Sequence, residues 1–151
     1  MSGSRPRRTY VESTIIMTTV RLVAPFVFTF GLFVMFHGAE SAGGGFQGGV
    51  IVAASLILVA FAFGIEPTRE WISDPPVRIA IAGGAYTFVL IGLGALLADG
   101  LFLQYDAYEI YHGTKYGIEL VELGIGAIVS GIILSLFMNL AAGVTEEGDQ
   151  S

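Results

Sequence analysis

The chain has 151 residues, of which 54% are hydrophobic and only 13% are charged, and its mean hydropathy is +0.73. Because soluble domains average about a quarter charged residues, a water-soluble globular domain is excluded. The chain has no cysteine and only two histidines, which excludes disulfides, thiolate catalysis and a histidine-built metal site. The net charge of −6 comes without any basic stripe, so nucleic acid is not expected as a partner.

Long apolar segments follow one another along the chain. A helix needs roughly 20 apolar residues to cross a hydrocarbon core of about 30 Å. We therefore predict an all-α integral membrane protein with four transmembrane helices, between an N-terminal segment 1–18 and an acidic tail 143–151. Prolines at positions 67, 75 and 76 are expected to end the second span and lead into the third. The predicted spans are about 19–36, 48–65, 77–98 and 117–142.

The basic residues predict the orientation of these spans. Arg21 starts the first span, and Arg69 and Arg78 lie in or beside the second connection, whereas Lys115 lies on the opposite side. With the N-terminal arginines, six of the seven basic residues fall on one side. Because basic residues concentrate in cytoplasmic loops, we expect both termini on the cytoplasmic side of the cell membrane. A cleaved signal peptide is the alternative for the first segment, but its apolar run is long for that role.

Glycines cluster between the first two spans. Residues 43–48 formally match the dinucleotide-binding pattern G-x-G-x-x-G, but that motif needs a preceding strand and a helix packed on a sheet, so nucleotide binding is rejected. We expect the glycines to allow a tight hairpin turn between two helices. A loop that dips into the membrane under the shelter of protein is the alternative. The residues expected to shape this loop are Gly43, Gly44, Gly45, Phe46, Gln47, Gly48 and Gly49.

Two carboxylates, Glu119 and Glu122, share one face near the start of the fourth span. A charged side chain deep in the bilayer costs roughly 2.5–3.5 kcal/mol on insertion scales and usually faces protein or water. For Glu119 the favoured interpretation is a solvated carboxylate paired with Lys115. Glu122 lies one turn deeper, and there we favour a role in exchanging protons or cations over a structural role. Both are kept as candidates for an ion path.

His37 and Glu40 close the first span beside the glycines and are the other two ion-path candidates. A histidine titrates near neutrality and could relay protons. The spacing alone favours the alternative, an interfacial imidazole bonded to a backbone carbonyl.

Tyrosines gather in the connection between the third and fourth spans. Tyr105, Tyr108 and Tyr111 would fall on one side of a short helix lying along the membrane. Amphipathic rings of this kind settle at the headgroup level, so an interfacial helix or a docking surface is expected.

The fourth span carries a stripe of small residues at four-residue intervals: Ala127, Gly131 and Ser135. Such a stripe lets helices approach closely, and the partner is equally well another helix of this chain or a helix of another subunit. Because no nucleophile with a positioned base is evident, an enzymatic function has no support.

The first half of the chain resembles a known family. The residues that carry the resemblance lie between positions 21 and 64. They are Arg21-Leu22-Val23-Ala24-Pro25, Gly31-Leu32, His37-Gly38, the glycine run from Gly43 to Gly49, and Ala62-Phe63-Gly64. This pattern is similar to the MnhB (MrpB) family, whose members are small subunits of the Mrp-type (Mnh) multisubunit sodium/proton antiporters.

The resemblance implies a four-helix subunit that does not transport alone but assembles with large proton-pumping subunits and other small ones. It implies Na⁺ and H⁺ as transported ions with no cofactor, and it marks His37 and Phe46 as functionally sensitive. The chain departs from the family pattern at two places. Ser41-Ala42 stands where a Ser-Pro is expected, and Glu122 stands where an aspartate is usual.

Other functions remain open at this level. One is a purely structural subunit of an antiporter or of a related membrane hydrogenase or respiratory complex. Another is a small autonomous transporter that works as a homo-oligomer.

Overall fold

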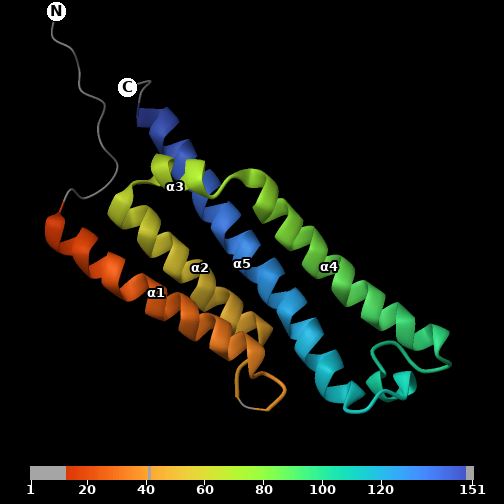
Figure 1. Cartoon of the computed structure of the whole chain (residues 1–151). Helices are drawn as coiled ribbons and strands as arrows, with labels where there is room; N and C mark the ends of the chain where they lie inside the picture. Colours follow the sequence, from red (N-terminus) through yellow and green to blue (C-terminus); the bar gives the residue numbers. More distant parts are fainter. Residues whose placement is uncertain (1–12, 41, 149–151) are drawn as a thin grey trace, which may run out of the picture.

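The computed structural model describes residues 13–40 and 42–148, with side chains described as far as residue 141. All of the secondary structure in this part of the chain is helical. The predicted segment 1–18 falls mostly, and the tail 143–151 partly, outside the described residues. In chain order the elements are α1 (Thr14–Phe36), α2 (Gly45–Phe63), α3 (Ile65–Trp71), α4 (Asp74–Leu97), the 3₁₀ helix η1 (Tyr105–Tyr108) and α5 (Gly113–Gly148) (Figure 1).

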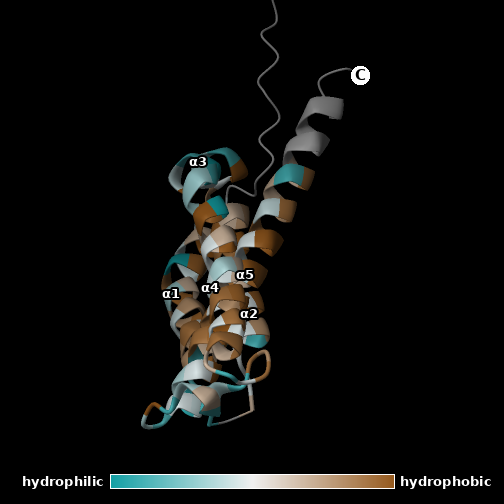
Figure 2. Ribbon diagram, turned by 90° about the vertical axis from the view of Figure 1, so that its right-hand side faces the viewer, coloured by the Kyte–Doolittle hydropathy of each residue, from teal (hydrophilic) through white to brown (hydrophobic). Residues whose placement is uncertain are grey.

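Helices α1, α2, α4 and the part of α5 from Gly113 to Ala141 are long and apolar enough to cross a membrane. With 23 and 19 residues, α1 and α2 are roughly 35 and 29 Å long at about 1.5 Å per residue. Figure 2 shows hydrophobic residues along the middle of the helices and hydrophilic ones toward both ends. The prediction of an all-α chain with four membrane-spanning helices is therefore confirmed by length and composition.

Each of these helices begins a few residues earlier than its predicted span. They start at residues 14, 45, 74 and 113, whereas the predicted spans start at 19, 48, 77 and 117. A helix continues for as long as its backbone hydrogen bonds are favourable, and it does not stop at the edge of the hydrocarbon layer. Where each helix enters and leaves the membrane stays a prediction.

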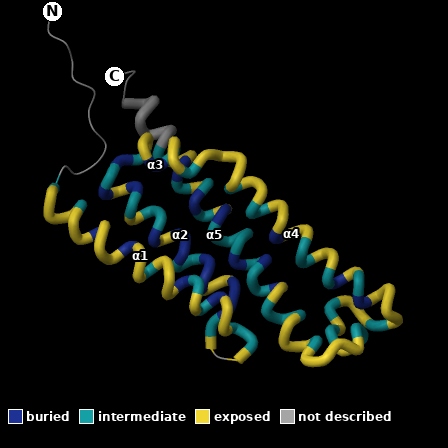
Figure 3. Tube along the Cα trace, viewed as in Figure 1, coloured by how far each residue is buried: buried dark blue, intermediate teal, exposed yellow. Residues whose placement is uncertain are grey.

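The four long helices form a layer in the spatial order α1, α2, α5, α4 (Figure 1). Helix α2 packs between α1 and α5, and α5 packs between α2 and α4. Viewed from the edge of the layer, the helices largely superpose (Figure 2). Buried positions concentrate on α2 and α5, whereas α1 and α4 expose much of their length (Figure 3). The layer thus presents two broad apolar faces rather than enclosing one central core.

The connection between α2 and α4 differs from the expectation that prolines end the second span. Helix α2 ends at Phe63 and is capped by Gly64, whose φ of +106° is unfavourable for other residues. Pro67 lies inside the short helix α3, in the first turn, where the missing N–H costs nothing. The Thr68 hydroxyl donates a hydrogen bond of 2.7 Å to the Gly64 carbonyl and is buried. Pro75 and Pro76 do begin a helix, as expected, because they occupy the first turn of α4.

Glycine pairs set the distance of α5 from its two neighbours. A Cβ atom added to Gly49 of α2 would lie only 2.8 Å from the carbonyl oxygen of Gly126 in α5. On the other side of α5, a Cβ atom on Gly124 would lie 2.9 Å from the carbonyl oxygen of Gly84 in α4. Backbones that approach this closely leave no room for side chains, as is common between membrane helices.

The tyrosine-rich connection does not form the single amphipathic helix that was expected. The 3₁₀ helix η1 ends at Tyr108, because Glu109 adopts a left-handed conformation with φ +50°. The Tyr108 hydroxyl donates a hydrogen bond of 2.5 Å to the carbonyl of Ile91 in α4. Tyr111, in contrast, is 85% exposed. The tyrosines therefore do not share one face: Tyr108 ties the connection to α4 and Tyr111 faces outward.

Candidate ion-handling site

Glu122 lies where three parts of the chain meet: α5, the connection between α1 and α2, and the first turn of α2. Its carboxyl group occupies the space that a Cβ atom on Gly38 would need. A Cβ atom on Gly44 would lie 2.7 Å from its Oε1 atom. The carboxyl group therefore sits in a slot walled by two glycines, which we call the glycine slot (Gly38 and Gly44 around Glu122).

The sequence builds this slot through backbone conformations and contacts that only glycine permits. Gly43 and Gly44 have φ angles of +151° and +138°, a region that residues with a Cβ atom rarely adopt. A Cβ atom on Gly45 would overlap the main-chain carbonyl of Glu122, so α2 begins directly against the α5 backbone. A Cβ atom on Gly48 would lie 2.7 Å from the Gly31 carbonyl oxygen in α1.

The predicted glycine loop is therefore shorter than expected. Only Gly43 and Gly44 lie in the connection, whereas residues 45–49 form the first turns of α2. Phe46 is 61% exposed and Gln47 is also exposed, so these two side chains do not line the slot. The short connection results from close packing, since the helical turn after Gly44 fits against α5 without side chains between them.

The environment of the Glu122 carboxyl group is unusual. Its Oε2 atom is buried and finds no hydrogen-bond partner within the described part of the chain. An unpaired polar atom away from water costs about 1–3 kcal/mol, and more when it is charged. The N-terminal end of α2, which carries partial positive charge, begins directly beside this carboxyl group. Such a group is able to hold a proton on Oε2 or to contribute an oxygen ligand to a cation.

Glu40 and Lys115 form an ion pair that joins the α1–α2 connection to the start of α5. The prediction that Lys115 pairs with Glu119 is therefore wrong: Lys115 donates its hydrogen bond to Glu40 instead. This hydrogen bond and the charge of Lys115 hold the pKa of Glu40 below its ordinary value. Glu119 itself is partly buried on the same face of α5 as Glu122, three residues away.

His37 directly follows α1 and stacks on Phe33, with ring centroids 4.1 Å apart. Its Nδ1 atom lies 3.0 Å from the Phe33 carbonyl oxygen. This contact is the carbonyl-bonded imidazole that the spacing favoured, and its place at the membrane interface stays a prediction. Whether His37 also relays protons stays a prediction, and its closeness to Gly38 keeps it next to the glycine slot.

Tyr105 is a neighbour of the site that the sequence did not reveal as such. Its ring fills the space above Gly117 of α5. Burial, and secondarily the charge of Glu122, raise the pKa of Tyr105 above its ordinary value. A hollow of about 450 Å³ opens at this end of the layer, lined by Ala39 and Lys115 among others.

The small-residue stripe on α5 serves different contacts along its length. A Cβ atom on Gly131 would lie 2.6 Å from Cγ1 of Ile81 in α4, so Gly131 packs within this chain. Ser135 accepts a hydrogen bond of 2.8 Å at its carbonyl from the Asn139 side chain. Ala127 is partly exposed.

Among the described residues, no three metal-ligating side chains gather, and the expectation that no cofactor is bound stays a prediction.

Two of the three carboxylate candidates have different surroundings. Glu122 lies inside the glycine slot, while Glu40 lies outside it and pairs with Lys115. Gly38 was not predicted as a site residue. The only sequence signal was its place in the His37-Gly38 pair, and nothing local indicates that a side chain 84 positions further on would rest against it.

Comparison with known proteins places the chain in a family. The profile of a domain related to the MnhB subunit of Na⁺/H⁺ antiporters matches residues 15–135. A protein of Staphylococcus haemolyticus (strain JCSC1435) named "Putative antiporter subunit mnhB2" is 30% identical over 139 residues, which cover 87% of this chain and 97% of that protein. A protein with the same name from Staphylococcus aureus (strain MRSA252) is 29% identical over 137 residues, with the same coverage. The chain therefore belongs to the family of domains related to the MnhB subunit of Na⁺/H⁺ antiporters.

Proposed function

We propose that this chain is a subunit of a multisubunit Na⁺/H⁺ antiporter and that its Glu122 carboxyl group takes part in the ion path. The observation that carries the second part of this proposal is the buried Oε2 atom in the glycine slot, which has no hydrogen-bond partner within the described residues. A permanent charge at such a place would be costly, since ionisable groups within membrane segments normally pair or face water. A group that exchanges its proton for a cation meets this requirement, because it is neutralised in both states.

In the proposed mechanism Glu122 alternates between a protonated and a cation-associated state. Carboxylate and carbonyl oxygens suit hard cations, and main-chain carbonyls of α5 lie beside the slot. Lys115 and Glu119 precede Glu122 on α5, and Lys115 pairs with Glu40 of the α1–α2 connection. In the proposed mechanism these charges attract or release the ion. Na⁺ and H⁺ are substrates in this scheme and no cofactor takes part. We accordingly propose transport rather than an enzymatic reaction.

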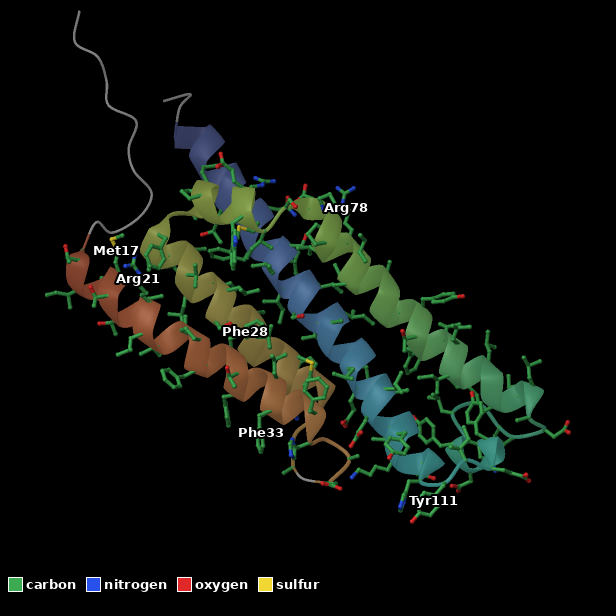
Figure 4. The ribbon with its side chains drawn as sticks, viewed as in Figure 1. Met17, Arg21, Phe28, Phe33, Arg78 and Tyr111 are labelled. Atoms are coloured by element: carbon green, nitrogen blue, oxygen red, sulfur yellow. The ribbon has the colours of Figure 1, made fainter. Side chains whose placement is uncertain are left out.

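We further propose that the end of the layer that carries α3 faces the cytoplasm of a cell membrane and that both termini lie there. Figure 4 shows Arg21 and Arg78 at this end and Tyr111 at the opposite end. Arg69, in α3, belongs to the same end. Basic residues favour the cytoplasmic side, so the glycine slot would open toward the outside.

The layered arrangement supports a role within a larger assembly. Two broad faces of the layer are apolar, and only α2 and α5 are packed on both sides. Other antiporter subunits are the proposed partners on at least one of these faces, with lipid on the remainder. Bracing of neighbouring subunits is then a second task of the same chain, and it is the whole task if Glu122 is not on the ion path.

The test compares Glu122→Gln with wild type in inverted membrane vesicles that contain the assembled complex. The initial rate of sodium-dependent proton exchange should fall by about tenfold or more, equivalent to about 1.4 kcal/mol in activation free energy, with unchanged amounts of co-purifying subunits. Glu70→Gln, which makes the same change of charge on exposed α3, should leave the rate unchanged. Full activity of Glu122→Gln would remove this residue from the path. A fall in rate that merely follows a loss of complex would leave the bracing role alone.

A further inference from the structure

A second polar cavity lies at the α3 end of the layer, far from the glycine slot along α5. It has a volume of about 90 Å³ and lies between α3, α4 and α5. A cavity of this size has room for a polar group larger than a water molecule. Its polar rim is formed by Arg69, Asp74, Arg78 and Asn139, and we call it the arginine cavity.

The local sequence explains why a cavity forms here. Gly64 turns the chain sharply, so α3 crosses the end of the layer before α4 begins at Asp74. Gly131 holds α4 and α5 close together at the level of Ile81. Beyond that level the two helices are no longer held by glycines, and larger side chains line the opening. Leu134 and Met138 of α5 form its apolar floor.

The charges of the rim fit one negatively charged group. Two arginines and one aspartate amount to a local charge of 2 − 1 = +1, and neither arginine forms an ion pair with any residue up to position 141, as far as side chains are described. An arginine guanidinium presents several N–H donors in a planar fork that matches the oxygens of a phosphate group. One phosphodiester would neutralise the rim and accept hydrogen bonds from both arginines.

The position of the cavity favours a lipid headgroup over free phosphate as the bound group. Trp71, the last residue of α3, is 74% exposed and directly precedes Ile72, which lines the cavity. Exposed tryptophans of membrane proteins settle at the headgroup level. The polar rim of the cavity matches a lipid headgroup, and its apolar floor matches the start of an acyl chain. Basic pockets between membrane helices on the cytoplasmic side are typical sites for anionic headgroups.

We propose that the arginine cavity binds the headgroup of an anionic phospholipid, with the phosphodiester on Arg69 and Arg78 and the start of an acyl chain against Leu134 and Met138. This site is separate from Glu122 and does not depend on a role of Glu122 in transport. A bound lipid would link α3, α4 and α5 at the end of the layer where glycine contacts no longer hold them together.

The test uses the purified antiporter complex in detergent, with phosphatidylglycerol, phosphatidylcholine or inorganic phosphate added separately. Bound lipid is measured by native mass spectrometry, and thermal stability is measured in the same samples. Phosphatidylglycerol should be retained by wild type and raise its melting temperature, while phosphatidylcholine and inorganic phosphate should do neither. The double variant Arg69→Gln/Arg78→Gln should lower the apparent affinity for phosphatidylglycerol by about tenfold or more.

Two control variants make the result specific. Arg21→Gln removes a positive charge at the same end of the layer but outside the cavity, where Arg21 lies over the Phe63 ring, and it should retain the lipid as wild type does. Asp74→Asn should increase retention, since it removes the negative charge from the rim. A damaged fold of the double variant would show as a lower melting temperature without lipid, in which case Arg78→Gln alone serves for the comparison.

The proposal is overturned if the arginine variants retain phosphatidylglycerol as well as Arg21→Gln does, or if phosphatidylcholine binds equally well. It is also overturned if inorganic phosphate alone gives the full stabilisation. Crosslinking of position 78 to a neighbouring subunit in place of lipid would assign the cavity to a protein contact instead.

Discussion

The close approach of α4 and α5 predicts opposite effects for two neighbouring glycines on α4. At Gly84 an added Cβ atom would overlap the carbonyl of Gly124 and lie 2.9 Å from Cγ1 of Ile128. At Gly83 an added Cβ atom would meet nothing within 4 Å. Both residues lie inside the same helix, so Gly84→Ala and Gly83→Ala differ chiefly in the packing that they disturb.

The expected difference in stability follows from these contacts. Ordinary van der Waals contact begins at 3.4 Å, so the carbonyl of Gly124 and the added Cβ atom of Gly84→Ala reach that distance only if the two helices separate by about 1 Å. The obstacle is backbone held by helical hydrogen bonds and cannot rotate aside, and overpacking of this kind costs about 1–3 kcal/mol. Replacing glycine by alanine in a helix favours both variants by a similar amount, about 1 kcal/mol. This gain cancels in the comparison.

The assay heats samples of the purified complex to a series of temperatures. Size-exclusion chromatography then measures the fraction of the chain that is still assembled, and the midpoint of its loss is the melting temperature. For chains of this size 1 kcal/mol corresponds to about 2–4 °C in melting temperature. Gly84→Ala should therefore melt roughly 2–12 °C below Gly83→Ala. Equal melting temperatures, or a lower one for Gly83→Ala, would refute the conclusion that direct glycine contact sets the α4–α5 distance.

Three further substitutions test other contacts. Lys115→Gln removes the group that lowers the pKa of Glu40. The ion pair stabilises the fold above the ordinary carboxyl pKa of 4.5, and this stabilisation is lost as the pH falls through the lowered pKa. Variant and wild type should therefore differ in melting temperature near neutrality and converge in acid, and a difference that stays constant with pH would contradict the ion pair. Tyr108→Phe removes a hydrogen bond of 2.5 Å and should cost about 0.5–1.5 kcal/mol in unfolding free energy, and an unchanged melting temperature would show that it contributes nothing. Phe46→Ala truncates a side chain that is 61% exposed, so it should reduce the recovery of partner subunits on affinity purification while the chain itself accumulates normally; full recovery would exclude Phe46 from the subunit contacts.

The class of the protein was accessible from sequence because the bilayer imposes simple requirements. A membrane helix must satisfy its own backbone hydrogen bonds and be apolar over about 20 residues, so composition and length suffice to predict four such helices. The glycine run and the carboxylate at position 122 were also recognisable locally. A charged residue within an apolar segment stands out regardless of its surroundings.

What the sequence could not provide was the partner of each side chain. Lys115 has Glu119 within one helical turn, yet it pairs with Glu40 across 75 positions, because the α1–α2 connection packs against the start of α5. The even spacing of Tyr105, Tyr108 and Tyr111 suggested one helical face. A left-handed residue at position 109 breaks that periodicity, and no sequence rule required it there.

The amino-acid sequence alone was therefore enough to predict an all-α membrane chain and the number of its candidate membrane-spanning helices, and to single out Glu122 as a carboxylate within an apolar segment. The packing of the helices was needed to establish that α5 inserts between α2 and α4 and that Gly38, Gly44 and Gly45 close around Glu122. The physical reason is that hydropathy acts on each segment separately. The glycine slot and the arginine cavity depend instead on how closely two backbones approach, and that distance is set jointly by residues far apart in the chain.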